Sequence, residues 1–101
     1  MLSNMKLFLA HCGFYSLDVG DGIYESHTNF FIVAEDFDDA KSKVKEMSVF
    51  KEKKMHVDGL QEIQAVDGFK VTLNYDASLG NKTFVVHRRH RDLVPKEVSK
   101  C

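Results

Sequence analysis

Two short pairs of histidine and carboxylate are the residues of this chain best suited to bind a metal ion. Glu25 and His27 stand two residues apart where an apolar segment begins, and His56 and Asp58 have the same spacing further along the chain. Side chains two apart in an extended strand point to one face. Imidazole nitrogen and carboxylate oxygen suit zinc, iron and manganese. If the two pairs meet, they can form a metal-binding or hydrolase-like site.

The same two pairs also fit a structural role. No H-E-x-x-H motif and no paired-cysteine spacing accompanies them. His27 and His56 can instead hydrogen-bond to nearby backbone and fix a loop, with the acids as their partners. Glu62 is expected on the same wet side as Asp58. The structural role is the simpler alternative.

Cysteine usage and the start of the chain indicate a cytoplasmic protein. Cys12 stands beside His11, but neighbours on a strand face opposite sides, so the two cannot act as nucleophile and base and Cys12 is expected to fill the core. The only other cysteine is Cys101. This pattern suggests a reducing compartment without a disulfide framework. The apolar run of residues 5–12 is too short for a signal core or a membrane span.

One basic segment, His87-Arg88-Arg89-His90-Arg91, could bind an anion. Its arginines Arg88, Arg89 and Arg91 are candidates for contacting phosphates or an acidic patch on a partner subunit. The chain has 14 basic and 15 acidic residues and a net charge of −1, so no overall field attracts it to nucleic acid or an anionic membrane. A solvated or partner-facing segment is therefore favoured over weak nucleic-acid binding.

The glycines predict no nucleotide cofactor. Gly20 and Gly22 are followed by an apolar strand rather than a helix, and no G-K-[ST] motif occurs. No ordered catalytic set is recognised either. We therefore expect a protein without a cofactor and without catalytic activity.

Hydrophobic periodicity predicts an α+β fold. The expected elements are strands at residues 5–14 and 27–34, a helix at 37–47, a hairpin at 55–75 and a short fifth strand at 82–87. Asp36 is the expected N-cap of the helix, with Asp39 as its capping partner. This order predicts a mainly antiparallel sheet of four or five strands with one main helix on one face. Residues 48–54 are interpreted as a basic linker.

The hairpin is expected to have long arms, because residues 69–75 alternate between apolar and polar. A loop of residues 66–68 is predicted in preference to a two-residue turn. That loop sets Ala65, and not Val66, opposite Phe69 and keeps the polar residues of the first arm off the dry face.

The chain length predicts one domain at residues 5–76, followed by an extension at 77–101 that contains the fifth strand and a flexible basic tail. The first two strands are apolar on both faces, and one helix covers only one. Exposure of large side chains in them would cost about 1.5–3 kcal/mol each. These are Phe8, Phe14, Phe30 and Ile32. Cover is expected from the loop at 15–26, from residues 83–86 or from a second copy. We favour a symmetric homodimer that binds another macromolecule or a small ligand.

Several short motifs resemble a known family. They are Glu25-Ser26-His27, Asp38-Asp39-Ala40-Lys41, Lys54, His56-Val57-Asp58, Glu62-Ile63 and Val66-Asp67-Gly68-Phe69. Together they resemble the bacterial family known as domain of unknown function 1543, over residues 5–75. The resemblance implies a small α+β domain of bacterial cytosolic proteins, found singly or in tandem, with no assigned activity.

Overall fold

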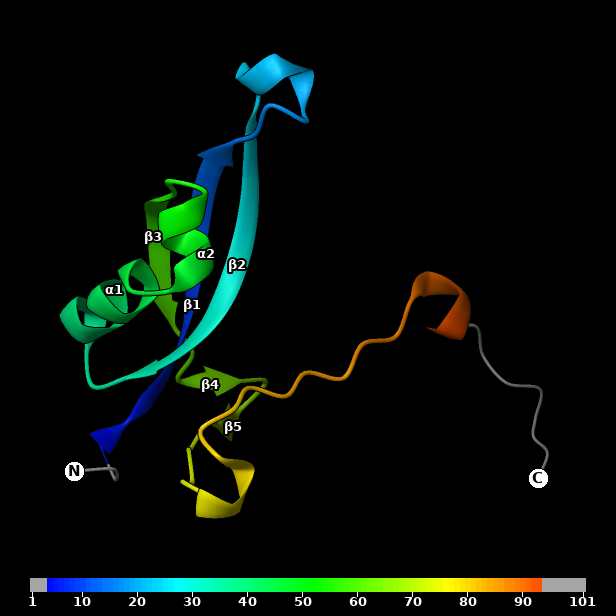
Figure 1. The fold of residues 1–101 in the computed structure, drawn as a ribbon. Helices are drawn as coiled ribbons and strands as arrows, with labels where there is room; N and C mark the ends of the chain where they lie inside the picture. Colours follow the sequence, from blue (N-terminus) through cyan, green and yellow to red (C-terminus); the bar gives the residue numbers. More distant parts are fainter. Residues whose placement is uncertain (1–3, 94–101) are drawn as a thin grey trace.

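The structure, a computed structural model, describes residues 4–93 and has an α+β architecture (Figure 1). A three-stranded sheet with the order β2-β1-β3 carries two helices on one face, and a two-stranded hairpin follows it. The elements are β1 (Lys6–Tyr15), β2 (Glu25–Ala34), α1 (Phe37–Lys45), α2 (Ser48–Glu52), β3 (His56–Glu62), β4 (Ala65–Val66) and β5 (Phe69–Lys70). The predicted fold class is confirmed, whereas the expected single sheet of four or five strands is divided in two.

The central strand β1 is antiparallel to both of its neighbours. Three successive side chains on its helix side are buried: Phe8, Ala10 and Cys12 have no exposed surface. Ile32 and Ala34 of β2 join them in the core. The side chains between them, beginning with Leu7 and Leu9, point to the face that carries no helix. Both strands predicted from the apolar runs are therefore confirmed.

A β-bulge interrupts the pairing of β3 with β1. Cys12 pairs with Val57 and His11 pairs with Gly59, which leaves Asp58 as the extra residue. Beyond the bulge the facing of β3 is inverted, so Glu62 pairs with buried Phe8 and lies on the helix side. The prediction that Glu62 shares the face of Asp58 is wrong for this reason. An inserted residue shifts the alternation of side chains between the two faces by one position.

Helix α1 begins as its sequence predicts. Asp36 is the N-cap, and its Oδ1 accepts a hydrogen bond of 2.8 Å from the backbone N–H of Asp39. Asp39 in turn accepts one of 3.0 Å at Oδ2 from the N–H of Glu35. Ala40 and Val44 are the buried residues of the helix, which packs on the sheet.

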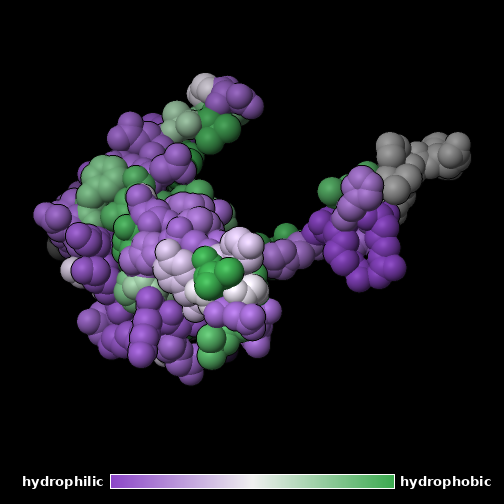
Figure 2. All heavy atoms as spheres, turned by 90° about the horizontal axis from the view of Figure 1, so that it is seen from above, coloured by the Kyte–Doolittle hydropathy of each residue, from purple (hydrophilic) through white to green (hydrophobic). Residues whose placement is uncertain are grey.

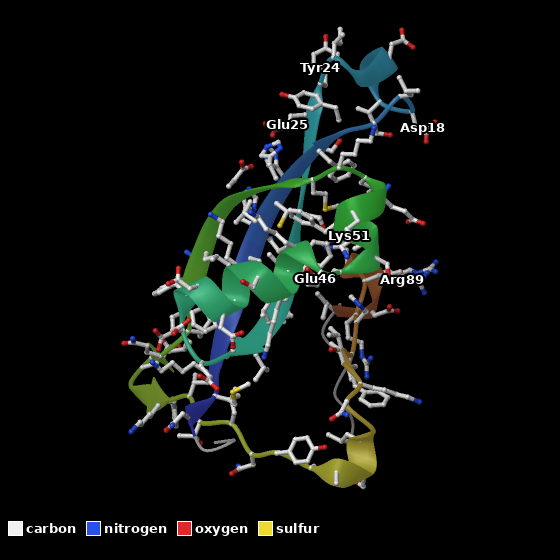
Figure 3. The ribbon with its side chains drawn as sticks, turned by 60° about the vertical axis from the view of Figure 1, so that its left-hand side comes forward. Asp18, Tyr24, Glu25, Glu46, Lys51 and Arg89 are labelled. Atoms are coloured by element: carbon white, nitrogen blue, oxygen red, sulfur yellow. The ribbon has the colours of Figure 1, made fainter. Side chains whose placement is uncertain are left out.

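Residues 48–54 form a second helix rather than the expected linker. Phe50 of α2 is 8% exposed and packs in the core with Phe8 and Ile32. Lys51 donates a hydrogen bond of 3.1 Å to Glu46 Oε1, which joins α2 to the end of α1 (Figure 3). The argument that Phe8 and Ile32 need cover from another subunit is therefore wrong, because the chain's own helices cover them: the ring of Phe37 in α1 lies 5.1 Å from that of Phe8, and Phe50 of α2 joins the same core. Phe14 and Phe30 pack partly buried against the same core.

The predicted long hairpin is wrong in its partner and in its register. Strand β3 pairs with β1, and only β4 and β5 form a hairpin, with Val66 opposite Phe69. Asp67 and Gly68 both have positive φ, 53° and 85°, as in a two-residue type I′ turn. Phe69 is 79% exposed. Because this hairpin has no buried face, burial does not favour the longer loop. The Asp-Gly turn therefore determines the register.

Residues 71–93 form an extended arm that leaves the sheet (Figure 1). It contains two short 3₁₀ turns, Ala77–Leu79 and His90–Leu93. The predicted strand at 82–87 is wrong: these residues have no strand pairing in the described chain, and Phe84 is 70% exposed. Figure 2 shows the arm as a projection from the body, with hydrophilic atoms gathered toward its end. The end of the expected basic tail, residues 94–101, lies outside the described residues. Within residues 4–93, no helix has the length and apolar character needed to cross a membrane.

Candidate metal centre

The three strands of the sheet bring the two histidine–carboxylate pairs together on the face without helices. Gly13 of β1 is the register partner of His27 on β2 and of His56 on β3, so the two histidines lie on either side of it. Glu25 stands two residues before His27, and Asp58 two residues after His56. All four predicted residues thus converge, although they come from the two edge strands.

Each carboxylate of this cluster contacts both imidazoles. Asp58 Oδ2 lies 3.1 Å from His27 Nε2, and Asp58 Oδ1 lies 3.2 Å from His56 Nε2. Glu25 Oε1 lies 3.4 Å from His27 Nε2, and Glu25 Oε2 contacts His56 Nε2. Every carboxylate oxygen of the cluster therefore faces an imidazole nitrogen.

These separations suit metal ligands as well as hydrogen bonds. A tetrahedral zinc ion with bonds of about 2.0–2.2 Å holds neighbouring ligand atoms about 3.3–3.6 Å apart. The three separations of 3.1 to 3.4 Å come close to that spacing. Without an ion, protonated imidazoles would satisfy the same carboxylates. The geometry fits the metal-binding alternative and also the pairing of the histidines with the acids that the structural alternative expects. The hydrogen bonds to backbone that the structural alternative also expects are not found for His27 or His56 among residues 4–93.

Gly13 provides the space in which the four side chains meet. A Cβ atom at this position would lie 2.7 Å from His56 Nε2 and 2.9 Å from Asp58 Oδ2, and it would also collide with Glu25. Gly13 does not have positive φ, so glycine is needed here for space and not for backbone conformation. Nothing in the sequence alone assigns Gly13 to the site. It could be recognised only once the sheet order was known.

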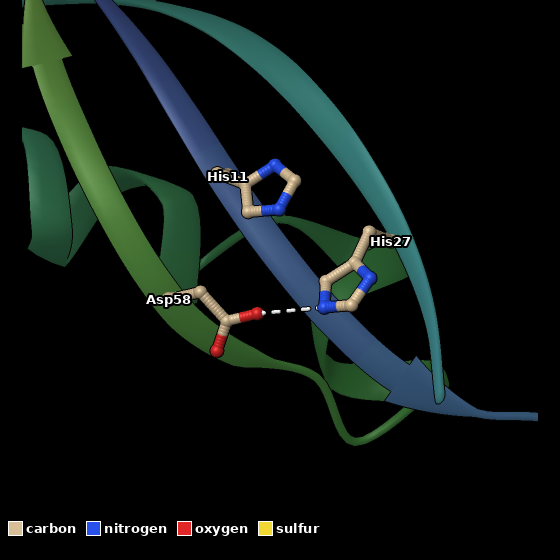
Figure 4. Close-up of side chains that lie close together, drawn as sticks. All are labelled: His11, His27 and Asp58. Carbon is tan, nitrogen blue, oxygen red and sulfur yellow. Dashed lines mark ion pairs between the residues drawn. The ribbon is translucent and has the colours of Figure 1, made fainter. Parts of the chain in front are cut away.

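His11 adds a third imidazole, which the sequence analysis considered only beside Cys12. Its ring stacks on that of His27, with centroids 4.9 Å apart and planes 9° apart (Figure 4). His11 Nδ1 lies 2.7 Å from Asn29 Oδ1. An amide oxygen only accepts, so Nδ1 donates, and in a neutral ring the lone pair is then on Nε2. The signal in the sequence is the H-x-G spacing of His11 and Gly13 on an interior strand.

The cluster lies open to solvent. The side chains of His27 and His56 are 40% and 46% exposed, and those of Glu25 and Asp58 are 29% and 32% exposed. Figure 3 shows Glu25 at the start of β2, next to Tyr24 in the loop that precedes this strand. The site is thus a surface cluster that a solute can reach directly.

Cys12 lies on the other side of the sheet from this cluster. It is fully buried, and burial raises the pKa of its thiol, with a further contribution from the negative charge of Asp58. The prediction that Cys12 and His11 face opposite sides is confirmed, since His11 is exposed on the face without helices.

The three arginines considered for anion binding lie on the arm, away from the cluster. Arg88 donates a hydrogen bond of 2.9 Å to the carbonyl of His87, and Arg89 Nε lies 3.4 Å from Asp92 Oδ2. Arg91 belongs to the short turn His90–Leu93 and is exposed. The contacts of Arg88 and Arg89 are with residues close in sequence, so the structure does not bring these arginines to the histidine–carboxylate cluster.

The fold and the cluster define a small α+β protein with a histidine–carboxylate surface site. The chain belongs to the family described as Domain of Unknown Function (DUF1543), whose model matches residues 22–73. The matched segment contains Glu25, His27, His56 and Asp58, whereas His11 and Gly13 precede it. No curated protein and no solved structure matches the chain. The family description assigns no activity.

Proposed function

We propose that this protein binds a first-row divalent metal ion, such as zinc or manganese, through Glu25, His27, His56 and Asp58. One observation carries the proposal: two histidines from opposite edge strands share the same two carboxylates, with three separations of 3.1 to 3.4 Å. Imidazole and carboxylate together are ligands of such ions.

Charge and space support a cation in preference to ion pairs alone. With neutral imidazoles, the four side chains carry two negative charges that a divalent ion would neutralise. Exposed ion pairs contribute only about 0–1 kcal/mol to stability. The cluster is partly exposed, so its polar groups contribute little to the fold without an ion. Gly13 also keeps free the volume that a side chain would otherwise fill.

Metal titration of the purified chain after chelator treatment tests the proposal. A ligand that binds only the folded state stabilises it by about 2.7 kcal/mol at a free concentration of 100 times its Kd. We expect zinc or manganese to raise the Tm of the wild type and to give a saturable calorimetric signal. Asp58→Asn should remove both effects.

His87→Ala is the matched control for His56→Ala, because His87 is an exposed histidine of the arm. Metal binding should survive the first substitution and be lost with the second. A wild-type Tm that does not respond to zinc, manganese or iron(II), with no heat of binding, contradicts the proposal.

We also propose that the protein is a homodimer, with the second copy bound to the apolar half of the same open face. Four side chains form this surface. Leu7 pairs with Val33, and Leu9 pairs with Phe31, across β1 and β2. Phe31 is 55% exposed and Val33 45% exposed, and contiguous exposed apolar surface marks interaction sites. This open strip replaces Phe8 and Ile32 as the reason for expecting a partner.

A second copy is the occupant we propose because each copy offers two apolar surfaces that lack cover. Besides the strip, the arm exposes Phe84 to 70% and Val86 to 80%. In a symmetric pair, the arm of each copy would cover the strip of the other. Light scattering tests this function: we expect a dimer for the wild type and for Phe69→Ser, and a monomer for Phe31→Ser. A wild-type monomer at micromolar concentration contradicts the proposal.

A further inference from the structure

We propose that the histidine–carboxylate cluster holds two metal ions bridged by Asp58. This inference rests on the proposed metal-binding function and specifies the number of ions. Two overlapping triads carry it: His11, His27 and Asp58 form one, and Glu25, His56 and Asp58 form the other. Within each triad, the candidate ligand atoms lie within 4.8 Å of one another.

Asp58 is shared between the triads through different oxygens. Its Oδ2 faces His27 at 3.1 Å, and its Oδ1 faces His56 at 3.2 Å. A carboxylate that bridges two ions gives one oxygen to each. In two-ion sites the ions lie about 3.5–4 Å apart. The two oxygens of Asp58 are therefore already divided as a bridge requires.

Glu25 repeats this arrangement from the opposite edge of the sheet. Its Oε1 lies 3.4 Å from His27 Nε2, and its Oε2 contacts His56. A single ion bound by one oxygen of each carboxylate accounts for only two of the four oxygens. In this cluster all four oxygens face an imidazole. This arrangement favours two ions, one beside each histidine.

His11 supplies the additional ligand of the ion beside His27. A metal-binding histidine commonly donates its second ring N–H to a carbonyl or carboxylate, which fixes the tautomer. His11 has this contact, because Nδ1 donates to Asn29 Oδ1 at 2.7 Å, and Nε2 is the nitrogen that a neutral ring would offer to an ion. The parallel stack on His27 must open for both rings to reach one ion. Both residues are exposed, so the rings have room to rotate once their stacking contact is given up.

The bulge in β3 gives Asp58 its central place. Asp58 has no register partner on β1, since Val57 pairs with Cys12 and Gly59 with His11. Its side chain thus lies between the two histidines. The protein ligands fill only part of each ion's coordination shell, so water would complete both shells. Zinc and manganese are the ions to test, because nitrogen and carboxylate oxygen suit both.

Counting ions per chain tests the inference. The metal-free protein is loaded with manganese or with zinc and desalted, and bound metal is measured by mass spectrometry against protein concentration. We expect two ions per chain in the wild type and in the control His90→Ala. We expect one in His11→Ala and a comparable loss in His11→Gln, with far-ultraviolet circular dichroism showing that each variant is folded.

Electron paramagnetic resonance of the manganese form gives a second measurement. A spin-coupled spectrum in the wild type that becomes that of an isolated ion in His11→Ala supports the bridge. One ion per chain in the wild type overturns the two-ion inference and leaves the proposed function intact. No bound ion overturns both. Two ions that persist in His11→Ala overturn the assignment of His11 as a ligand.

Discussion

Gly13 of β1 and His56 of β3 are register partners, and a Cβ atom on Gly13 would lie 2.7 Å from His56 Nε2. We therefore expect Gly13→Ala to push His56 and Asp58 out of position. Metal affinity should fall by about 10-fold or more, the scale of losses on disturbing the surroundings of a metal ligand. Calorimetric titration of the variant with zinc measures the change.

Gly59→Ala is the matched control for this substitution. Gly59 lies on β3, the strand that pairs with β1, and directly follows Asp58, but a Cβ atom there would have nothing within 4 Å. Metal affinity should stay at the wild-type value. If Gly13→Ala binds zinc as tightly as Gly59→Ala, the four side chains do not meet above Gly13 when the ion is bound.

Truncation of Phe50 should strongly destabilise the fold, because this side chain of α2 is 8% exposed and packs in the core. Replacing a buried phenylalanine by alanine costs about 3–5 kcal/mol. Urea unfolding followed by circular dichroism measures this loss. Phe69→Ala is the control: Phe69 is 79% exposed, so its loss should change the free energy of unfolding by about 0.5 kcal/mol or less. Equal losses for the two variants would contradict the placement of α2.

Local sequence patterns were sufficient to predict the first elements along the chain. The two-faced apolar runs located β1 and β2, and Asp36 located the start of α1. The spacing of two residues in each histidine–carboxylate pair predicted which side chains share a face. These properties depend on neighbours along the chain, and the sequence contains them directly.

The partner of β3 could not be predicted in this way. Alternation shows which side chains of a strand share a face, but it does not identify the strand that pairs with it. The turn at residues 66–68 and the alternation of residues 69–75 predict that the latter pair with the segment of β3, whereas β1 is its partner. The bulge at Asp58 and the role of Gly13 follow from that pairing. Neither could therefore be predicted before the sheet order was known.

Removal of the N-cap of α1 should cost about 1 kcal/mol of stability, within the range of about 0.5–2 kcal/mol found for such caps. Asp36 Oδ1 accepts the hydrogen bond of 2.8 Å from the N–H of Asp39, and Asp36→Ala leaves that donor without its partner. Asp38→Ala is the control, since it removes a first-turn acid without removing the cap. Urea unfolding should rank Asp36→Ala as the less stable variant, and the reverse order would contradict the cap.

The thiol of Cys12 should react slowly with iodoacetamide in the native protein. The thiolate is the reactive form. Burial, followed by the charge of Asp58, raises the pKa of Cys12 above its ordinary value of 9.0 and lowers the thiolate fraction at pH 8. In the Cys101→Ser variant, which leaves one thiol, alkylation of the native chain should be much slower than that of the chain unfolded in guanidinium. A native rate equal to the unfolded rate would contradict the burial of Cys12.

The raised pKa of Cys12 also sets the sign of a pH effect on stability. The folded state holds the proton more tightly than the unfolded state does, so its contribution is complete below the ordinary pKa of 9.0. It is lost as the pH rises above that value, because the unfolded chain releases the proton first. The free energy of unfolding should therefore fall more steeply between pH 8 and pH 10 for Cys101→Ser than for Cys12→Ala with Cys101→Ser. Equal slopes in the two urea series would show that Cys12 does not contribute.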